Sequence, residues 1–454
     1  MANAIERTAG DVGARSATVT GHERSGSVGG RPGDHALFGV SEPATDQART
    51  TSRIDPGAAI GQRPRPTPRK FRDLLAIEDF DRHARRRLPR MVYGYVAGAV
   101  ETGASFDTAR LAFQNYRFKP RTFVDVSGRD QSVELFGRRW SSPFGIAPLG
   151  GAAFVAYRAD IRLAEAARTE NVPMILSASS LIRLEDVHAA NPDAWFQAYL
   201  AGDQPRIDRL IDRVAAAGFK TLVVTGDTPI LGNREHNIRS GFSMPMKLTP
   251  KVVWQSAMAP GWLLGTVGRT YWRHGSPHFE NTDAERGPPM MSKLVRNTAK
   301  RDELQWKHVE AIRRRWTGNL VIKGIVTASD ARIARESGAD GVILSNHGGR
   351  QLDHTIAPLD SLAEAASEKG AMKVMIDSGL RRGTDVLKAV ALGADFVFLG
   401  RPFLYAATVG GADGVGHAIG ILRTEIDRDL ALLGVRRPGD LDQGFVVRTD
   451  GRPL

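Results

Sequence analysis

Short apolar runs that alternate with helical stretches are the feature that most constrains this fold. Eight runs, each long enough for one buried strand, lie at 144–147, 174–176, 195–199, 222–224, 320–322, 341–344, 374–376 and 396–399. Helical patterns separate them, for example at 204–217, 328–338 and 382–393. Alternation of this kind indicates a parallel sheet, and eight units predict an α/β fold, a closed (β/α)8 TIM barrel rather than an open doubly wound sheet.

The rest of the chain is organised around this barrel. Residues 1–68 lack apolar periodicity and end in a Pro/Arg-rich stretch, which predicts a disordered tail and linker. Residues 69–440 form the predicted barrel domain, which begins with a helical segment, and 441–454 form a C-terminal tail. The segment of about 230–318, after the fourth strand, predicts a long loop that is either functional or disordered.

Composition and spacing exclude several classes of site. The chain has no cysteine, which rules out disulfides, thiolate metal sites and cysteine nucleophiles. The absence of cysteine also agrees with a cytoplasmic protein, which we expect. No apolar run approaches the ~20 residues that span a bilayer. The net charge is +12, but the basic residues are dispersed, which favours a solvated surface over nucleic-acid binding. We expect no metal site, because His274, His278 and His308 lack tight ligand spacing.

Polar and glycine residues follow the predicted strands, at the end of the barrel where active sites lie. In chain order they are Pro148, Leu149, Gly150, Ser177, Gln197, Tyr199, Thr225, Asp227, Lys323, Ser345, His347, Arg350, Asp377, Ser378, Gly379, Arg381, Gly400 and Arg401. Chance would scatter such residues among the loops. Their placement at nearly every strand end therefore predicts an active site.

Two groups of these residues indicate a chemistry. Glycine and arginine after the last two strands, as in 377–381 and 400–401, are typical of a barrel phosphate site. His347 and Asp227 suggest an imidazole–carboxylate pair in which the carboxylate orients the ring and makes it a stronger base. A purely structural histidine is the alternative.

Three cations complete the predicted site. Lys323 would stabilise an anionic ring or an enolate, or would form a Schiff base. Arg234 and Arg350 suit a carboxylate, although surface ion pairs would also use them.

Several segments resemble the FMN-dependent 2-hydroxy-acid oxidases and dehydrogenases, a family that includes glycolate oxidase and L-lactate dehydrogenase. They are SNHGGRQLD at 345–353, IDSGLRRGTD at 376–385 and LGR at 399–401, with further matches at 88–95 and 118–121. The resemblance covers about residues 71–440. It implies oxidation of an (S)-2-hydroxy acid to the 2-keto acid, with electrons passing through FMN to a quinone or another acceptor.

The resemblance also implies roles for individual residues. His347 is the base and Asp227 its partner, while Tyr95, Tyr199, Arg234 and Arg350 bind the substrate. The implied FMN contacts are Pro148, Leu149, Gly150, Ser177, Gln197, Thr225, Lys323, Ser345, Asp377, Ser378, Gly379, Arg381, Gly400 and Arg401. The proton leaves either from the α-carbon or from the hydroxyl group, and the residues do not distinguish these routes.

Within the family, the resemblance is strongest to the mandelate dehydrogenases, on residues 251–253, 273–275, 377–379 and 404–405. L-lactate or a mandelate-like acid is the expected substrate. Gly150 stands where many oxidases carry alanine, which favours a dehydrogenase over an oxygen-using oxidase or monooxygenase; an FMN barrel isomerase is a further alternative. The resemblance implies a homotetramer. It also implies that the aromatic, basic loop at 245–275 binds the inner face of the cell membrane, with a lid as the alternative.

Overall fold

The computed structural model describes residues 68–292 and 299–451. The chain divides into two units, 1–55 and 56–454, and all described residues belong to the second. The predicted tail and linker therefore lie outside the described residues, except for Pro68.

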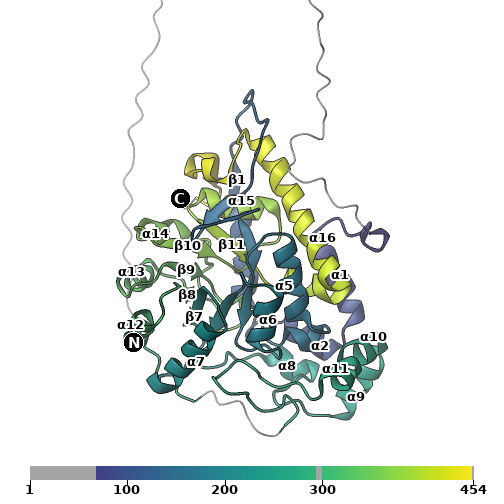
Figure 1. Ribbon diagram of the computed structural model, residues 1–454. Coiled ribbons are helices and arrows are strands. Elements are labelled where there is room, and N and C mark those ends of the chain that lie inside the picture. Colours follow the sequence, from purple (N-terminus) through teal and green to yellow (C-terminus); the bar gives the residue numbers. More distant parts are fainter. Residues whose placement is uncertain (1–67, 293–298, 452–454) are drawn as a thin grey trace, which may run out of the picture. The chain divides into compact units, whose positions relative to one another are not determined.

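Parallel strands form the centre of the described domain (Figure 1). They are β4 (Phe144–Ile146), β5 (Ile175–Ser177), β6 (Trp195–Ala198), β7 (Thr221–Thr225), β8 (Asn319–Ile325), β9 (Gly341–Leu344), β10 (Lys373–Ile376) and β11 (Phe396–Leu399). Each of β5 to β11 pairs with its neighbour in chain order, and β11 pairs with β4. A bridge between Ile146 and Met174 spans the remaining gap. The predicted barrel is confirmed, because all eight apolar runs are strands of this nearly closed sheet.

Amphipathic helices surround the strands. They are α4 (Ala152–Val155), α5 (Ala159–Thr169), α6 (Leu184–Ala190), α7 (Gln204–Ala216), α12 (Trp306–Arg315), α13 (Ala328–Glu336), α14 (Leu362–Ser367), α15 (Gly383–Ala391) and α16 (Arg401–Leu433). In α7, the Asp203 carboxylate accepts a hydrogen bond from the Arg206 amide at the N-terminus. Ile207, Leu210, Ile211 and Val214 then form one buried stripe, since they recur at helical spacing.

The N-terminal part of the domain covers the barrel. Its elements are η1 (Arg69–Phe71), α1 (Ile77–Arg87), α2 (Arg90–Ala97), α3 (Ala104–Leu111), η2 (Ala112–Asn115), β1 (Tyr116–Phe118), β2 (Val133–Leu135) and β3 (Arg138–Trp140). The β2–β3 hairpin closes the N-terminal end of the barrel, where Leu135 and Trp140 join a buried cluster with Trp195 and Phe396. The active site is thereby confined to the opposite end.

The sequence predicts a tail at 441–454, but the described part of this segment contains a strand that pairs with the domain. After η4 (Pro438–Asp440) and η5 (Gln443–Phe445), strand β12 (Val446–Arg448) pairs antiparallel with β1. Phe445 and Val446 are buried. This pairing joins residues over three hundred positions apart in the chain, so no local pattern predicts it.

The long segment between β7 and β8 contains several short helices. They are α8 (Glu235–Ser240), α9 (Pro250–Ala257), α10 (Pro260–Trp262), the π-helical turn η3 (Leu263–Gly268) and α11 (Arg269–His274). Figure 1 shows α9, α10 and α11 grouped beside α2 and α8 at one end of the barrel. Among the described residues, no helix is long and apolar enough to cross a membrane.

Candidate active site

A cavity of about 490 Å³ lies at the C-terminal ends of the strands. Most of the predicted site residues line it: Tyr95, Pro148, Leu149, Gly150, Tyr199, Thr225, Arg234, Lys323, His347, Arg350, Asp377, Ser378, Gly379, Arg381, Gly400 and Arg401. Ser177, Gln197, Asp227 and Ser345 do not line the cavity. Asp227 contacts the lining residue His347, and Ser345 accepts a hydrogen bond from the lining residue Lys323. The Ser177 hydroxyl donates to Gln197 Oε1 near the ends of β5 and β6.

His347 is held by contacts to both ring nitrogens. Nδ1 lies 2.9 Å from Asp227 Oδ1, and Nε2 lies 3.5 Å from the Tyr199 hydroxyl. The residue has a φ of +56°, a left-handed conformation that non-glycine residues rarely adopt, and its amide donates to Ser345 Oγ. This backbone geometry, together with the Asp227 contact, turns the imidazole into the cavity.

The charges around His347 suit a base. Burial lowers the pKa of His347 against the opposing effect of Asp227, so the ring is neutral near pH 7. Burial alone would raise the pKa of Asp227, but His347 and Lys323 outweigh it and keep the carboxyl ionised. A neutral imidazole beside a fixed carboxylate can accept a proton and be stabilised afterwards.

Lys323 is a buried, charged group. Its Nζ donates to Ser345 Oγ at 2.7 Å and lies 3.1 Å from Asp377 Oδ2. Burial opposes the charge, but Asp377 and Asp227 outweigh burial and raise the pKa of Lys323. A Schiff-base lysine needs a lowered pKa, so this environment favours the predicted role as a fixed cation.

Two arginines of the cavity, Arg350 and Arg401, have no acidic partner among the described residues. Arg350 and Arg401 both donate to the carbonyls of Val96 and Gly98, and Arg401 also donates to that of Gly348. Burial, and then neighbouring arginines, lower the pKa of Arg350 to about 10 and that of Arg401 to about 9. No ion pair in the described part of the chain neutralises either side chain. Such an excess of buried positive charge suits anionic ligands.

Two strand-end residues, Thr225 in the cavity wall and Gln197 outside the lining, carry unsatisfied polar groups. Gln197 Nε2 and Thr225 Oγ1 are buried, and neither has a hydrogen-bond partner among the described residues. Buried polar groups of proteins normally have partners, so a bound polar ring system is the simplest explanation. These two groups, with Lys323 and the arginines, fit the polar edge of a flavin and its phosphate.

Two predicted residues also have structural roles. Gly379 has a φ of +87°, and a Cβ there would lie 2.1 Å from the Ala109 carbonyl oxygen, so packing alone requires glycine. Arg234 donates to the Arg350 carbonyl and to Gln351 Oε1, which supports the loop that carries Arg350.

Tyr95 joins the substrate side of the cavity to the loop after β4. Its hydroxyl donates to the Gly150 carbonyl at 2.9 Å. The Arg350 guanidinium lies 5.3 Å from the centroid of its ring, and Phe242 stacks on the ring at 4.4 Å. Tyr95 and Arg350 are therefore adjacent, as carboxylate binding would require.

Sequence reasoning did not single out several lining residues: Leu231, Ile238, Phe242, Met244, Phe279, Met290 and Arg301. All belong to the segment between β7 and β8, in which no single periodicity is sustained. The length of that segment and its aromatic content were the available signals.

Comparison with known proteins supports the fit to a flavin. Residues 84–448 match the family model described as FMN-dependent dehydrogenase. The chain is 37% identical to (S)-mandelate dehydrogenase of Pseudomonas putida over 364 residues, which is 80% of this chain and 91% of that one. It is 36% identical to a putative L-lactate dehydrogenase of Mycobacterium tuberculosis, over 81% of this chain and 87% of that one.

A solved structure agrees with these matches. The crystal structure of the monotopic membrane protein (S)-mandelate dehydrogenase superposes with a TM-score of 0.76 at 35% identity, over 83% of this chain and 100% of that chain. The fold, the family match and the identities lead to one conclusion. The chain belongs to the family of FMN-dependent 2-hydroxy-acid dehydrogenases and oxidases, and FMN is its cofactor.

Proposed function

We propose that the protein oxidises an (S)-2-hydroxy acid to the 2-keto acid, with His347 as the base. The observation that carries the proposal is the contact of His347 with Asp227 at 2.9 Å in a cavity that also contains Arg350 and Tyr95. FMN, when bound, accepts the two electrons of the oxidation. We further propose that a quinone or another non-oxygen acceptor receives them from the enzyme.

Each active-site residue has a separate role in the proposed oxidation. Arg350 binds the substrate carboxylate, and the Tyr95 hydroxyl turns from the Gly150 carbonyl to donate to the same carboxylate. This places the hydroxyl-bearing carbon near His347. His347 takes a proton, and Asp227 stabilises the resulting imidazolium. Tyr199, 3.5 Å from His347 Nε2, contacts the substrate hydroxyl region. Lys323 supplies positive charge at the flavin side, where negative charge develops.

The apolar part of the cavity supports a substrate with an apolar side chain. Leu231, Ile238, Phe242, Met244 and Phe279 line this part, and all of them come from the segment between β7 and β8. L-lactate and mandelate-like acids carry an apolar methyl or phenyl group, whereas glycolate has no side chain. We therefore expect these acids to react faster than glycolate.

Anaerobic mixing of the purified holoenzyme with (S)-mandelate, (R)-mandelate, L-lactate and glycolate tests this function. The flavin absorbance should bleach with the S acids, and one keto acid should appear per flavin reduced. If none of the acids bleaches the flavin, the proposal is wrong, and another FMN barrel activity such as isomerisation takes its place. Admission of air should restore the colour slowly; rapid return would identify an oxygen-using oxidase.

We also propose that the loop at 245–275 binds the inner face of the cell membrane. Its outward side carries large apolar side chains that are more than half exposed: Leu248, Val253, Trp254, Met258, Leu264 and Trp272. The same loop carries four exposed basic residues, Lys247, Lys251, Arg269 and Arg273, which suit anionic headgroups. The solved (S)-mandelate dehydrogenase is described as a monotopic membrane protein, which supports membrane binding by this loop.

Sedimentation with anionic lipid vesicles tests membrane binding. Trp254→Ser and Trp272→Ser should each lower the sedimented fraction. Leu432→Ser is the matched control, because Leu432 is 74% exposed but lies at the end of α16. Equal sedimentation of all variants would contradict the proposal and favour a lid.

A homotetramer is the proposed assembly. Two exposed apolar side chains outside the loop at 245–275 are candidates for a contact between chains. They are Phe123, at 107% relative exposure, and its neighbour Val124, at 44%. Light scattering should give the mass of four chains of 49.3 kDa. A monomer mass at micromolar concentration would contradict it.

A further inference from the structure

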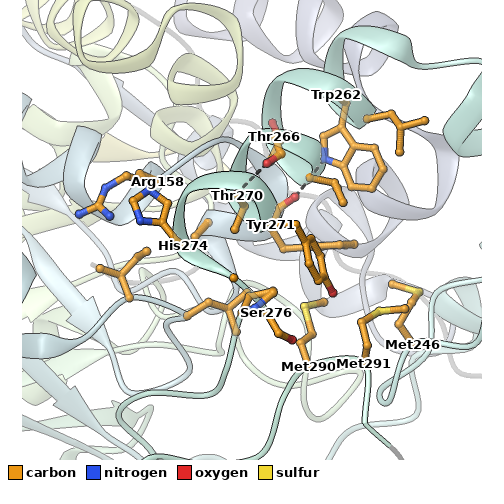
Figure 2. A pocket seen from close by; sticks show the side chains of 18 of the residues that line it. Arg158, Met246, Trp262, Thr266, Thr270, Tyr271, His274, Ser276, Met290 and Met291 are labelled. Atoms are coloured by element: carbon orange, nitrogen blue, oxygen red, sulfur yellow. Dashed lines mark hydrogen bonds between the residues drawn. The ribbon is translucent and has the colours of Figure 1, made fainter.

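A second cavity, of about 510 Å³, lies under the helices α9 to α11 (Figure 2). It is separate from the active-site cavity, and Met290 alone among the described residues lines both. Side chains from α4, α6, the π-helical turn and the loop after α11 enclose it. Its volume is within the range of small-molecule sites in proteins, which is roughly 300–1,000 Å³.

We infer that this second cavity binds a lipophilic quinone, the acceptor that reoxidises the reduced enzyme. The inference rests on the proposed function, because that function supplies the electrons. Two electrons and two protons from the reduced enzyme convert the two quinone carbonyls to the hydroxyls of a quinol. The substrate and the quinone then occupy different cavities at the same time.

The walls suit a flat apolar ring. Phe154 and Trp262 meet edge to face, with ring centroids 5.3 Å apart. The Trp262 Nε1 atom donates to the Phe154 carbonyl at 3.0 Å, so the polar atom of this indole is already satisfied. Met246, Met290 and Met291 lie together on the other side in Figure 2, and flexible thioethers adapt to aromatic ligands.

One end of the cavity is polar. Figure 2 shows Arg158 and His274 at the end away from the methionines. The His274 ring is positioned by Tyr157, whose hydroxyl lies 2.9 Å from His274 Nε2, and Arg269 lies 4.1 Å from the Tyr157 ring centroid. A guanidinium and an imidazole at one end of an apolar cavity are suitable donors for a quinone carbonyl.

Aromatic side chains connect the two cavities. Tyr95, whose hydroxyl donates to the Gly150 carbonyl, stacks on Phe242 at 4.4 Å. The ring centroids of Phe242 and Phe154 lie 6.4 Å apart, and Phe154 contacts Trp262 in the second cavity. Electron transfer weakens steeply with distance through empty space, so this packed route allows transfer without entry of the quinone into the active site.

The second cavity opens on the surface that we propose to bind membrane. Leu248, Val253 and Tyr271 line the cavity and are 70%, 55% and 43% exposed. A quinone dissolved in the bilayer would thus meet the opening directly. The apolar lining and the apolar exposed surface are continuous through these three residues.

Cavity-filling variants test the inference. Thr266→Phe places a ring in the cavity, since Thr266 is 8% exposed and lines it. Leu432→Phe is the control: Leu432 is 74% exposed, lies at the end of α16 and lines neither cavity. Met291→Trp, from a different segment, is a second filling variant. The probe is a benzoquinone with a ten-carbon chain, and ten-carbon alkanol is the control ligand.

Two readouts are needed. Calorimetric titration of the oxidised holoenzyme with the benzoquinone should show binding that Thr266→Phe and Met291→Trp each weaken by about tenfold or more. Leu432→Phe should leave this binding unchanged. Reoxidation of dithionite-reduced enzyme by the benzoquinone should slow by a similar factor in both filling variants. Flavin bleaching by the 2-hydroxy acid and reoxidation by ferricyanide should stay within about twofold of the parent.

Several results would overturn the inference. One is unchanged benzoquinone binding and reoxidation in both filling variants; another is competition between the benzoquinone and an unreactive substrate analogue. Equally tight binding of the alkanol would show a general lipid site. Because dithionite reduces the flavin without substrate, these measurements stand even if no 2-hydroxy acid reacts.

Discussion

Replacement of Asp227 by asparagine isolates the charge that the carboxylate supplies to His347. The substitution keeps the shape of the side chain, and the contact to Nδ1 is 2.9 Å in the parent. When His347 holds a proton, the two charge centres lie about 4 Å apart and attract by about 4 kcal/mol at an effective dielectric constant of about 20. A neutral hydrogen bond from asparagine retains about 1 kcal/mol. The loss of about 3 kcal/mol corresponds to a rate of flavin bleaching lowered by about 10²-fold.

The pH dependence of the same variant supplies an independent check. Neutral His347 is the active form, so the bleaching rate should fall as the pH drops through the pKa of His347, which burial places below its ordinary value. Asp227 opposes this lowering, so its removal should move the acid limb to still lower pH.

Stopped-flow bleaching under anaerobic conditions measures both effects. Asp340→Asn is the control, because Asp340 pairs with Arg313 at 2.7 Å and does not line the active-site cavity. A bleaching rate for Asp227→Asn within about threefold of the parent would refute the reasoning, since it would mean that the carboxylate contributes less than about 1 kcal/mol.

Three further predictions concern the cofactor site and stability. Lys323→Met leaves Asp377 buried without its cation, so thermal unfolding should show a free energy of unfolding lowered by about 3–5 kcal/mol. The purified variant should also have lost FMN, and unchanged FMN content would count against the role assigned to Lys323. Arg401→Ala should raise the Kd for FMN by about 10- to 100-fold, read from the fluorescence of released flavin, whereas the exposed Arg436→Ala should not. Burial raises the pKa of Asp160 to about 6, so the charged carboxylate destabilises the fold above that pH and the neutral acid does not below about pH 4. Asp160→Asn should therefore raise the free energy of unfolding by about 3 kcal/mol at pH 8 and by little at pH 4. Equal gains at both pH values would contradict this prediction.

The strands and the strand-end residues were predictable because both depend on local pattern. A run such as 341–344 must be buried on both faces of a parallel sheet, and the polar residue that follows it must then lie at the open end of the barrel. This rule places His347 and Asp227 at the same end of the barrel, although 120 residues separate them.

Other parts of the structure depend on contacts that no local pattern records. The helices α9 to α11 pack around a cavity rather than a core, so no continuous apolar stripe marks them. The pairing of β12 with β1 joins distant parts of the chain. The Ser345 hydroxyl contacts both Lys323 and the His347 amide, and these contacts depend on how β8 and β9 pack together.

The most direct test of the central claim is single-turnover reduction of the His347→Ala holoenzyme. FMN content and the absorbance spectrum are measured first, and the enzyme is then mixed anaerobically with saturating (S)-2-hydroxy acid. We predict full FMN occupancy and bleaching slower by about 10³- to 10⁴-fold, because the variant keeps Arg350, Tyr95 and Lys323 but lacks the base. Near-normal bleaching with intact FMN would contradict the assignment of His347.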